Sequence, residues 1–349
     1  MVSSPTLRGA PPLLGRRALL AGLAGLAACV PAAPPERPEP APARLGALGD
    51  ALAAPGCEWL VLLEPERIQQ TAWLRPLLGR ILRDERLDLF AATTGVDLRV
   101  VPELVLASYL PRSDAGEQSD GAASLTLCRH RGDVRAIERL FRDRLTRHVS
   151  RSVPAEGIVV VSGDVGRKPQ AFVAIGPDVV GFQSGGSRTH GPARVAALYA
   201  QGSLAGVPTV LAEPELGAQL RALGPAPLRA LLAGPFEGEL AHGARGLFAA
   251  ATAVAAAITP TEHQTLRCDV LLRGDYAPSP ERAATLLSLA WKDLAASDLG
   301  HLCGVHEPLR APLAEARPEG PALSVELDAR TLFDGLAAAT VDNVREIMR

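Results

Sequence analysis

The chain has 349 residues, and its 36 basic and 38 acidic side chains give a formal net charge of −2 at neutral pH. A chain this close to neutral lacks the basic surplus of a nucleic-acid-binding protein, so we expect no nucleic-acid partner. The length suits one large or two ordinary domains. Lys168 and Lys292 are the only lysines, and this arginine bias weakens any argument from an arginine cluster alone.

Residues 1–28 have the pattern of an export signal. Arg8, Arg16 and Arg17 precede an apolar run over residues 18–28, which is shorter than the roughly 20 residues that a membrane-spanning helix needs. Leu26-Ala27-Ala28-Cys29 resembles the lipobox of bacterial lipoproteins. The resemblance implies that a diacylglycerol is attached to the sulfur of Cys29 and that the chain is cleaved just before it. The alternatives are an ordinary secreted protein with a chance cysteine, or a leader that is not removed.

The export route stays open. Arg16-Arg17-Ala18-Leu19-Leu20 resembles a twin-arginine signal, although Gly15 stands where that signal favours Ser or Thr. Residues 29–45 are rich in proline and have no periodic apolar pattern, which predicts an extended, semi-rigid linker. We therefore expect a signal peptide over 1–28 and a lipidated cysteine with its linker over 29–45, followed by a folded body.

The first half of the body, residues 46–203, is expected to alternate strands and helices. Residues 58–63 predict a strand, and a helix follows Pro65; a second helix over 87–94 stops at Gly95. Asp133 is expected to cap a helix whose apolar residues recur at a 3.6-residue period. Further strands are expected over residues 104–110, 123–128, 157–161, 171–175 and 179–182, and a helix over 193–201.

The second half, residues 204–349, repeats this pattern. Helices are expected over residues 216–223 and 239–247, a strand over 228–232, and a hairpin from residues 248–258 and 264–273. Ser279 is expected to cap a long helix with Pro280 in its first turn. A strand over 323–327 and a helix over 332–348 complete the chain.

Both halves thus predict an α+β fold in which antiparallel sheets are faced by helices, as two related halves on a proline-rich N-terminal stalk. The layout, with its hairpin over 171–182 and its Gly202-Ser203-Leu204 junction, resembles a loosely defined group of exported bacterial proteins of unknown function. The resemblance implies a duplicated α+β domain, and no activity comes with it.

The segment 185–190, Gly-Gly-Ser-Arg-Thr-His, lies after a strand and before a helix. Backbone N–H groups at a helix start attract anions, so Arg188 and His190 are candidates for an anion site. The segment lacks both the Walker spacing and the dinucleotide glycine fingerprint. The simpler interpretation, a flexible connection, is favoured.

Cysteines and histidines give no firm metal or disulfide prediction. His301, Cys303 and His306 could supply three ligands, but their spacing matches no structural zinc site, so we expect neither a metal nor a cofactor other than the lipid on Cys29. Export would permit disulfides among the remaining cysteines, with the pairing open. Period-two alternation places Cys268 on an apolar strand face, where a buried free thiol is expected.

Residues 129–151 contain eight arginines against three acids. Arg135, Arg139 and Arg142 could therefore rest on anionic lipid headgroups. The alternative, which the arginine bias favours, is a solvated helix face with the pairs Glu138–Arg142 and Asp143–Arg147.

No Gly-x-Ser-x-Gly elbow, zincin helix or Ser-x-x-Lys set is present, although a triad could still assemble from distant residues. We expect a lipoprotein anchored in the bacterial cell envelope, outside the cytoplasm, with the outer membrane favoured over the inner. Its body is expected to be a non-catalytic binding or assembly module for an envelope protein, polymer or lipid. An uncharacterised periplasmic hydrolase is the alternative, and a solute receptor is third because hairpins disfavour its parallel sheets.

Overall fold

The computed structural model describes residues 45–110, 121–276 and 279–339. The predicted signal peptide, Cys29 and almost all of the predicted linker lie outside these residues, as does the end of the helix expected over 332–348. Within the described part, the fold is α+β, with strands that are all antiparallel to their neighbours.

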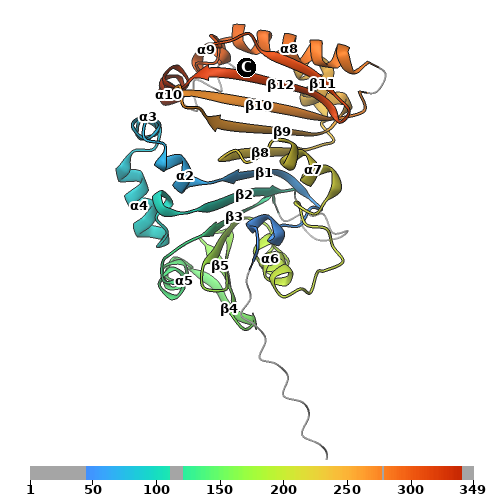
Figure 1. The fold of residues 1–349 in the computed structure, drawn as a ribbon. Helices are drawn as coiled ribbons and strands as arrows, with labels where there is room; N and C mark the ends of the chain where they lie inside the picture. Colours follow the sequence, from blue (N-terminus) through green and yellow to red (C-terminus); the bar gives the residue numbers. More distant parts are fainter. Residues whose placement is uncertain (1–44, 111–120, 277–278, 340–349) are drawn as a thin grey trace, which may run out of the picture. The chain divides into compact units, whose positions relative to one another are not determined.

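The strands form one 12-stranded sheet in the order β11-β12-β10-β9-β8-β1-β2-β3-β7-β6-β5-β4 (Figure 1). Their bounds are β1 (Cys57–Leu63), β2 (Glu103–Tyr109), β3 (Ala123–Arg129), β4 (Arg147–Ala155), β5 (Ile158–Val165), β6 (Lys168–Ile175), β7 (Val179–Ser184), β8 (Leu228–Ala233), β9 (Ala251–Pro260), β10 (Thr265–Gly274), β11 (Leu313–Arg317) and β12 (Gly320–Asp328). The expectation of separate sheets is thus corrected. β1 of the first predicted half pairs with β8 of the second, from Trp59↔Leu232 to Leu63↔Leu228, and joins the strands of both halves.

Most of the expected helices form close to their expected positions. The α-helices are α2 (Pro65–Gln70), α3 (Arg75–Ile81), α4 (Asp84–Thr94), α5 (Val134–Asp143), α6 (Pro192–Ala200), α7 (Pro214–Ala222), α8 (Pro280–Ala296), α9 (Asp298–Leu302) and α10 (Ala329–Ala338). Short 3₁₀ helices are η1 (Leu48–Ala51), η2 (Leu98–Val100), η3 (Gly238–His242) and η4 (Ala244–Ala250). The helix expected over 239–247 is therefore a pair of 3₁₀ turns.

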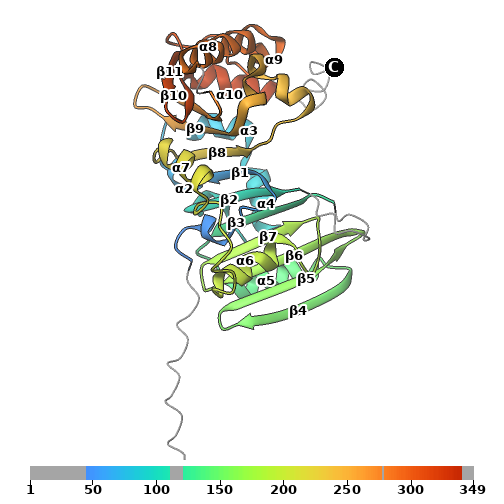
Figure 2. The same ribbon diagram turned by 90° about the vertical axis from the view of Figure 1, so that its right-hand side faces the viewer.

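Helices cover both faces of the sheet because the strands alternate apolar side chains (Figure 2). On β6, Val173 packs in a cluster with the alanines of α6, whereas the neighbouring Phe172 packs in a cluster with Ile137 and Phe141 of α5. Leu272 and other side chains of β10 and β12 form a third cluster with α8. A fourth joins α3 and α10. Residues 42–349 form one compact unit by their contacts, the property that lets a domain fold alone.

The N-terminal segment of the described chain is held against the sheet. Leu48 and Leu52 are fully buried in the same cluster as α6. The Arg129 guanidinium on β3 donates to the backbone carbonyls of Leu45 and Gly46, at 3.3 and 2.8 Å, and Glu103 accepts from the Leu48 N–H. The point at which the linker would meet the body is therefore fixed to the sheet.

Candidate functional site

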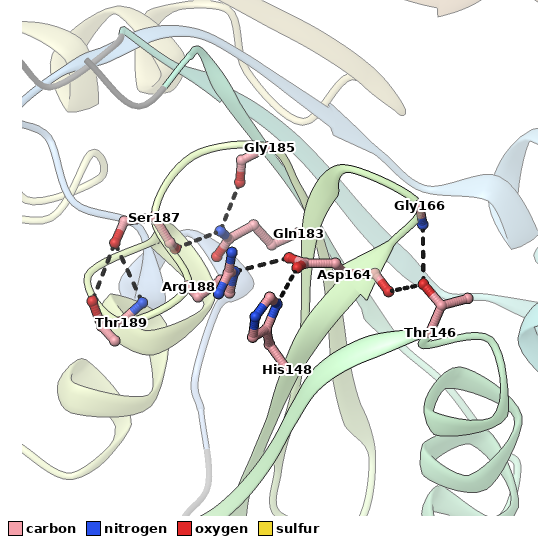
Figure 3. A network of polar contacts seen from close by, with 9 residues as sticks. All are labelled: Thr146, His148, Asp164, Gly166, Gln183, Gly185, Ser187, Arg188 and Thr189. Carbon is pink, nitrogen blue, oxygen red and sulfur yellow. Dashed lines mark hydrogen bonds and ion pairs between the residues drawn. The ribbon is translucent and has the colours of Figure 1, made fainter. Parts of the chain in front are cut away.

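Asp164, near the end of β5, is the centre of a polar network (Figure 3). The side chain is buried, with an exposed fraction of 6%. Its Oδ2 lies 2.6 Å from Nδ1 of His148, and its Oδ1 lies 2.8 Å from Nε of Arg188. The hydrogen bond to His148, followed by the charge of Arg188, holds the pKa of Asp164 below its ordinary value. Asp164 is therefore a buried carboxylate between two basic side chains that reach the surface.

The start of β4 aims His148 at Asp164. The pairing of β4 with β5 shifts register between Arg147 and Ser150, and His148 has a φ of 52°, in the left-handed region that side chains other than glycine rarely adopt. Thr146 secures the turn, since its hydroxyl donates to the Asp164 carbonyl at 3.0 Å and accepts from the Gly166 N–H at 3.2 Å. Irregular edge pairing of this kind re-aims side chains, and strained residues concentrate at functional sites.

The loop that carries Arg188 is organised by Gln183, which is only 1% exposed. Its Nε2 donates to the carbonyls of Gly185 and Ser187 at 2.9 and 3.1 Å, while its Oε1 accepts from the Ala193 N–H at 3.0 Å. The Ser187 hydroxyl in turn accepts from the N–H groups of Thr189 and His190. The loop is therefore tied by hydrogen bonds to one buried amide and to one of its own hydroxyls.

The two residues predicted to bind an anion, Arg188 and His190, contact different groups. Arg188 contacts Asp164, whereas His190 is exposed and lies 3.0 Å from the Thr189 hydroxyl. Three backbone donors near this loop, the N–H groups of Thr189, His190 and Ala193, are taken by Ser187 and Gln183. An anion at this loop would therefore have to compete with bonds that already exist within the chain.

The Asp164–His148 pair has the geometry of an acid–base dyad, and sequence reasoning did not find it. In the described part of the chain, Asp164 is the one hydrogen-bond partner of His148. The hydroxyls of Ser187 and Thr189 bond within their own loop, and among the described residues no hydroxyl or thiol makes a hydrogen bond to the His148 ring. The pair can hold and orient a proton, but the described side chains bring no nucleophile to it.

α5 and β4 together carry an exposed basic surface, which we call the basic edge: Arg135, Arg139, Arg142, Arg147, Leu140, Val149 and Val153. The helix buries Ile137 and Phe141 and leaves Arg135, Arg139 and Arg142 exposed on its other side. Among the large apolar side chains, Leu140, Val149 and Val153 are 37%, 51% and 55% exposed. Basic and aliphatic groups thus reach the solvent from the same helix and edge strand.

The ion pairs expected along this helix do not form. Glu138 is nearly buried, and its Oε1 lies 2.6 Å from Nε of Arg151 on β4, so it does not pair with Arg142. Within the residues that the structure describes, no carboxylate lies within ion-pair distance of the other predicted partner, Arg147, or of the arginines at 135, 139 and 142. The arginine bias of the chain, rather than helical ion pairs, is then what remains in favour of a simple solvated face.

The histidines at 301 and 306 do come together, but as stacked rings. Their centroids are 4.4 Å apart, with an interplanar angle of 29°. A search of the described residues finds no group of three or more His, Cys, Asp or Glu side chains that could hold a metal ion. The four cysteines of the body are free, and Cys268 packs against the cluster under α8, on the apolar face that the alternating pattern predicts, although it is half-buried rather than buried.

Three cavities of about 440, 350 and 200 Å³ lie in the described part, and neither His148 nor Asp164 lines any of them. Between residues 45 and 339, apart from the two gaps, no helix is long and apolar enough to cross a bilayer.

No protein-family model matches the chain, and no curated protein matches it. Two solved structures, crystal forms IV and I of TP0453 from Treponema pallidum, superpose on it. Each is 10% identical; the alignments cover 84% and 85% of this chain and 98% of each TP0453 chain, with TM-scores of 0.42 and 0.41. A likeness at this level carries no argument about function.

Proposed function

We propose that the protein is a lipid-anchored lipoprotein of the bacterial cell envelope, and that its body is a non-catalytic binding module that rests on anionic lipid headgroups. The observation that carries the lipid contact is the basic edge, in which Arg135, Arg139 and Arg142 have no ion-pair partner among the described residues. The exposed Val149 and Val153 on the adjacent strand add apolar groups that suit the interfacial region of a bilayer.

The anchor and the basic edge would act together. A linker over residues 29–45 that is extended at about 3.1 Å per residue reaches about 50 Å, so a body tied to Cys29 stays close to the membrane. Each basic residue near an anionic surface contributes about 1 kcal/mol. Contacts this weak suffice when the tether keeps the effective concentration of lipid high.

The anchor is tested in cells. Cys29→Ser removes the sulfur that would carry the diacylglycerol, so the variant should lose incorporation of labelled palmitate and should leave the membrane fraction. Cys57→Ser, which changes a buried thiol of the body, is the control and should keep both. A wild-type chain that keeps residues 1–28 and carries no lipid at position 29 would refute this part of the proposal.

The lipid contact is tested by co-sedimentation of residues 30–349 with vesicles of phosphatidylcholine alone or mixed with phosphatidylglycerol. We expect salt-sensitive binding to the anionic vesicles. Reversal of the three arginines of α5 to glutamate should weaken it by about a hundredfold or more, since each contributes about 1 kcal/mol. The matched control reverses Arg86, Arg282 and Arg330, which are exposed on α4, α8 and α10. Equal loss in both triple variants, or no loss in either, would contradict the proposal.

A periplasmic hydrolase is the second candidate, and the Asp164–His148 pair is the observation that favours it. Labelling with a fluorophosphonate probe that disappears in His148→Ala and persists in His190→Ala would support a serine hydrolase. Neither member of the pair lines any of the three cavities described above.

The proposal includes two related halves. Counted outward from the β1–β8 junction, the strands of the first half follow the order β1-β2-β3-β7-β6, and those of the second half follow the order β8-β9-β10-β12-β11. In each half a hairpin leads to a helix, α5 or α8, and a final strand leads to another, α6 or α10. The antiparallel β1–β8 pairing is what a two-fold relation between the halves requires, and β4 and β5 would then be an extra hairpin in the first half.

A further inference from the structure

The largest of the three cavities lies apart from the basic edge and from the Asp164 network. It has a volume of about 440 Å³ and is lined by η1, the end of β1, the starts of β2 and β8, and α7. This volume is within the range of about 300–1,000 Å³ that is typical of small-molecule sites.

Two arginines of this cavity have no charged partner in the described part of the chain. Arg229, on β8, lines the cavity; its Nε is buried and finds no hydrogen-bond acceptor there. Arg221, on α7, folds back along its helix, so that its Nη1 lies 3.1 Å from where a Cβ on Gly217 would be. A buried guanidinium N–H without an acceptor is costly, and a bound acceptor would remove that cost.

The carboxylates of the same cavity are engaged with other residues. Glu64 accepts from Arg67 at 3.2 Å, and Glu103 accepts from the Leu48 N–H at 3.1 Å. Arg221 and Arg229 are therefore the positively charged side chains of this cavity that a ligand can contact. The negative charge of the two carboxylates nevertheless favours a ligand with a single negative charge over one with two, because like charges repel strongly in a partly buried site.

The rest of the wall is mainly apolar. Leu62 and Leu63 come from β1, Pro102 from the segment before β2, and Leu211 and Leu220 from the region of α7. Close packing shapes the opposite side, where a Cβ on Gly49 would come within 2.5 Å of Leu211. The cavity thus offers positive charge together with an aliphatic surface, the combination that holds an amphiphile.

We propose that this cavity binds a small amphiphile with one carboxylate and an aliphatic body, of the class of medium-chain fatty acids. The carboxylate accepts from Arg229 and Arg221, and the aliphatic chain lies against the leucines. Because no residue of this cavity belongs to the basic edge, the inference is independent of the headgroup contact proposed above.

The test is calorimetric titration of residues 30–349 with decanoate, because residues 42–349 form one compact unit. Decanol, which has the same chain without the charge, and decyl phosphate, which can carry two charges, are the comparison ligands. We expect decanoate to bind more tightly than either. Decanol binding as tight as decanoate binding would overturn the role of the arginines, and tighter binding of decyl phosphate would overturn the carboxylate assignment.

Arg229→Met is the decisive variant, since methionine keeps an unbranched aliphatic chain without the guanidinium. It should weaken decanoate binding by about tenfold or more, because a hydrogen bond to a charged group contributes about 1.5–3 kcal/mol. Arg267→Met, on β10 and outside the cavity, is the matched control and should bind as the wild type does.

A second measurement guards against misfolding of Arg229→Met. The midpoint of thermal unfolding should rise with decanoate in the wild type and in Arg267→Met and should stay unchanged in a folded Arg229→Met. If that variant does not fold, Arg221→Met replaces it, with the same weakening expected. No decanoate binding by the wild type, or undiminished binding by both cavity variants, would refute the proposal.

Discussion

His130 is a histidine that the fold keeps away from water, with an exposed fraction of 5%. Its Nδ1 accepts from the Gly132 N–H at 3.0 Å, and its Nε2 is buried with no partner in the described part of the chain. Burial lowers the pKa of His130, and the negative charge of Asp178 only partly offsets this effect. The folded protein therefore resists protonation at this position more than the unfolded chain does.

We predict that this residue makes stability depend on pH. Above about pH 6.5, the ordinary pKa of histidine, His130 is mostly neutral in both states; as the pH falls below it, the unfolded state takes up the proton first and the free energy of unfolding decreases. The slope for one proton is at most about 1.4 kcal/mol per pH unit. Urea unfolding between pH 7.5 and 5 measures it.

His130→Gln should flatten this dependence, because glutamine keeps an acceptor for Gly132 and does not titrate. His263→Gln, which changes an exposed histidine in the turn between β9 and β10, should leave it as in the wild type. A dependence that survives the first substitution and disappears with the second would contradict the assignment.

Single residues with a local role are the ones that sequence reasoning placed correctly. Asp133 caps α5, since its side chain accepts from the Arg135 N–H, and Gly95 ends α4 in the left-handed conformation. Ser279 does precede α8, but its side chain makes no capping hydrogen bond. The contact between His148 and Asp164 joins two strands through an irregular turn, and no short-range pattern announces such a pair.

At the scale of elements, the loop between β7 and α6 depends on Gln183. We predict that Gln183→Leu lowers the free energy of unfolding by about 2–4 kcal/mol, because the carbonyls of Gly185 and Ser187 and the N–H of Ala193 all lose a buried partner. Urea unfolding followed by circular dichroism measures the change.

The control for this loop is Gln170→Leu. The Gln170 amide donates one exposed hydrogen bond, to the Ser184 hydroxyl at 3.0 Å, so its loss should cost less than about 1 kcal/mol. Equal costs for the two substitutions would show that the loop does not depend on the buried amide.

The strands that sequence reasoning missed are β4 and β11, which form the two edges of the sheet. β4 is mostly exposed and rich in arginine and serine, and β11 is short and mostly exposed, so neither shows the alternation that identifies a half-buried strand. Charged, short and irregular strands are common at edges because they discourage pairing with other chains. The polar and irregular composition that protects an edge strand from pairing with other chains is thus also the reason why the strand is hard to predict from the sequence.

At the scale of the whole body, the two predicted halves share more than the β1–β8 pairing. The largest cluster combines Leu60 and Ala107 of the first half with Leu231 and Ala255 of the second. α3 of the first half likewise packs with α10 of the second. Neither half therefore has a core that is closed without the other.

We predict that the body unfolds in one cooperative transition. Variants that keep only Trp59, in the first half, or only Trp291, in the second, with phenylalanine at the other tryptophan positions, should give urea midpoints that coincide with each other and with circular dichroism. Removal of apolar contacts at the junction by Leu231→Ala should lower both midpoints together. Midpoints that separate in the wild-type background would mean that the halves unfold independently.

The α+β class and most of its antiparallel strands follow from the sequence, because hairpins and helix periodicity are short-range features. The number of sheets did not follow, because β1 and β8 are far apart in the chain and their pairing leaves no local signal. The cavity could not be predicted from the sequence either. Its arginines come from α7 and β8, and another part of its wall comes from η1, far away in the chain.

The Arg129 guanidinium donates hydrogen bonds to the carbonyls of Leu45 and Gly46. Arg129 belongs to β3, which lies between β2 and β7 in the sheet. A mechanical load on the chain before Leu45 is therefore passed to a strand in the interior of the sheet. Such a strand is released only when the hydrogen bonds on both of its sides are sheared together, whereas an edge strand can be unzipped bond by bond. With the anchor proposed above, a body attached in this way would resist a pull on its N-terminal segment better than one attached through an edge strand.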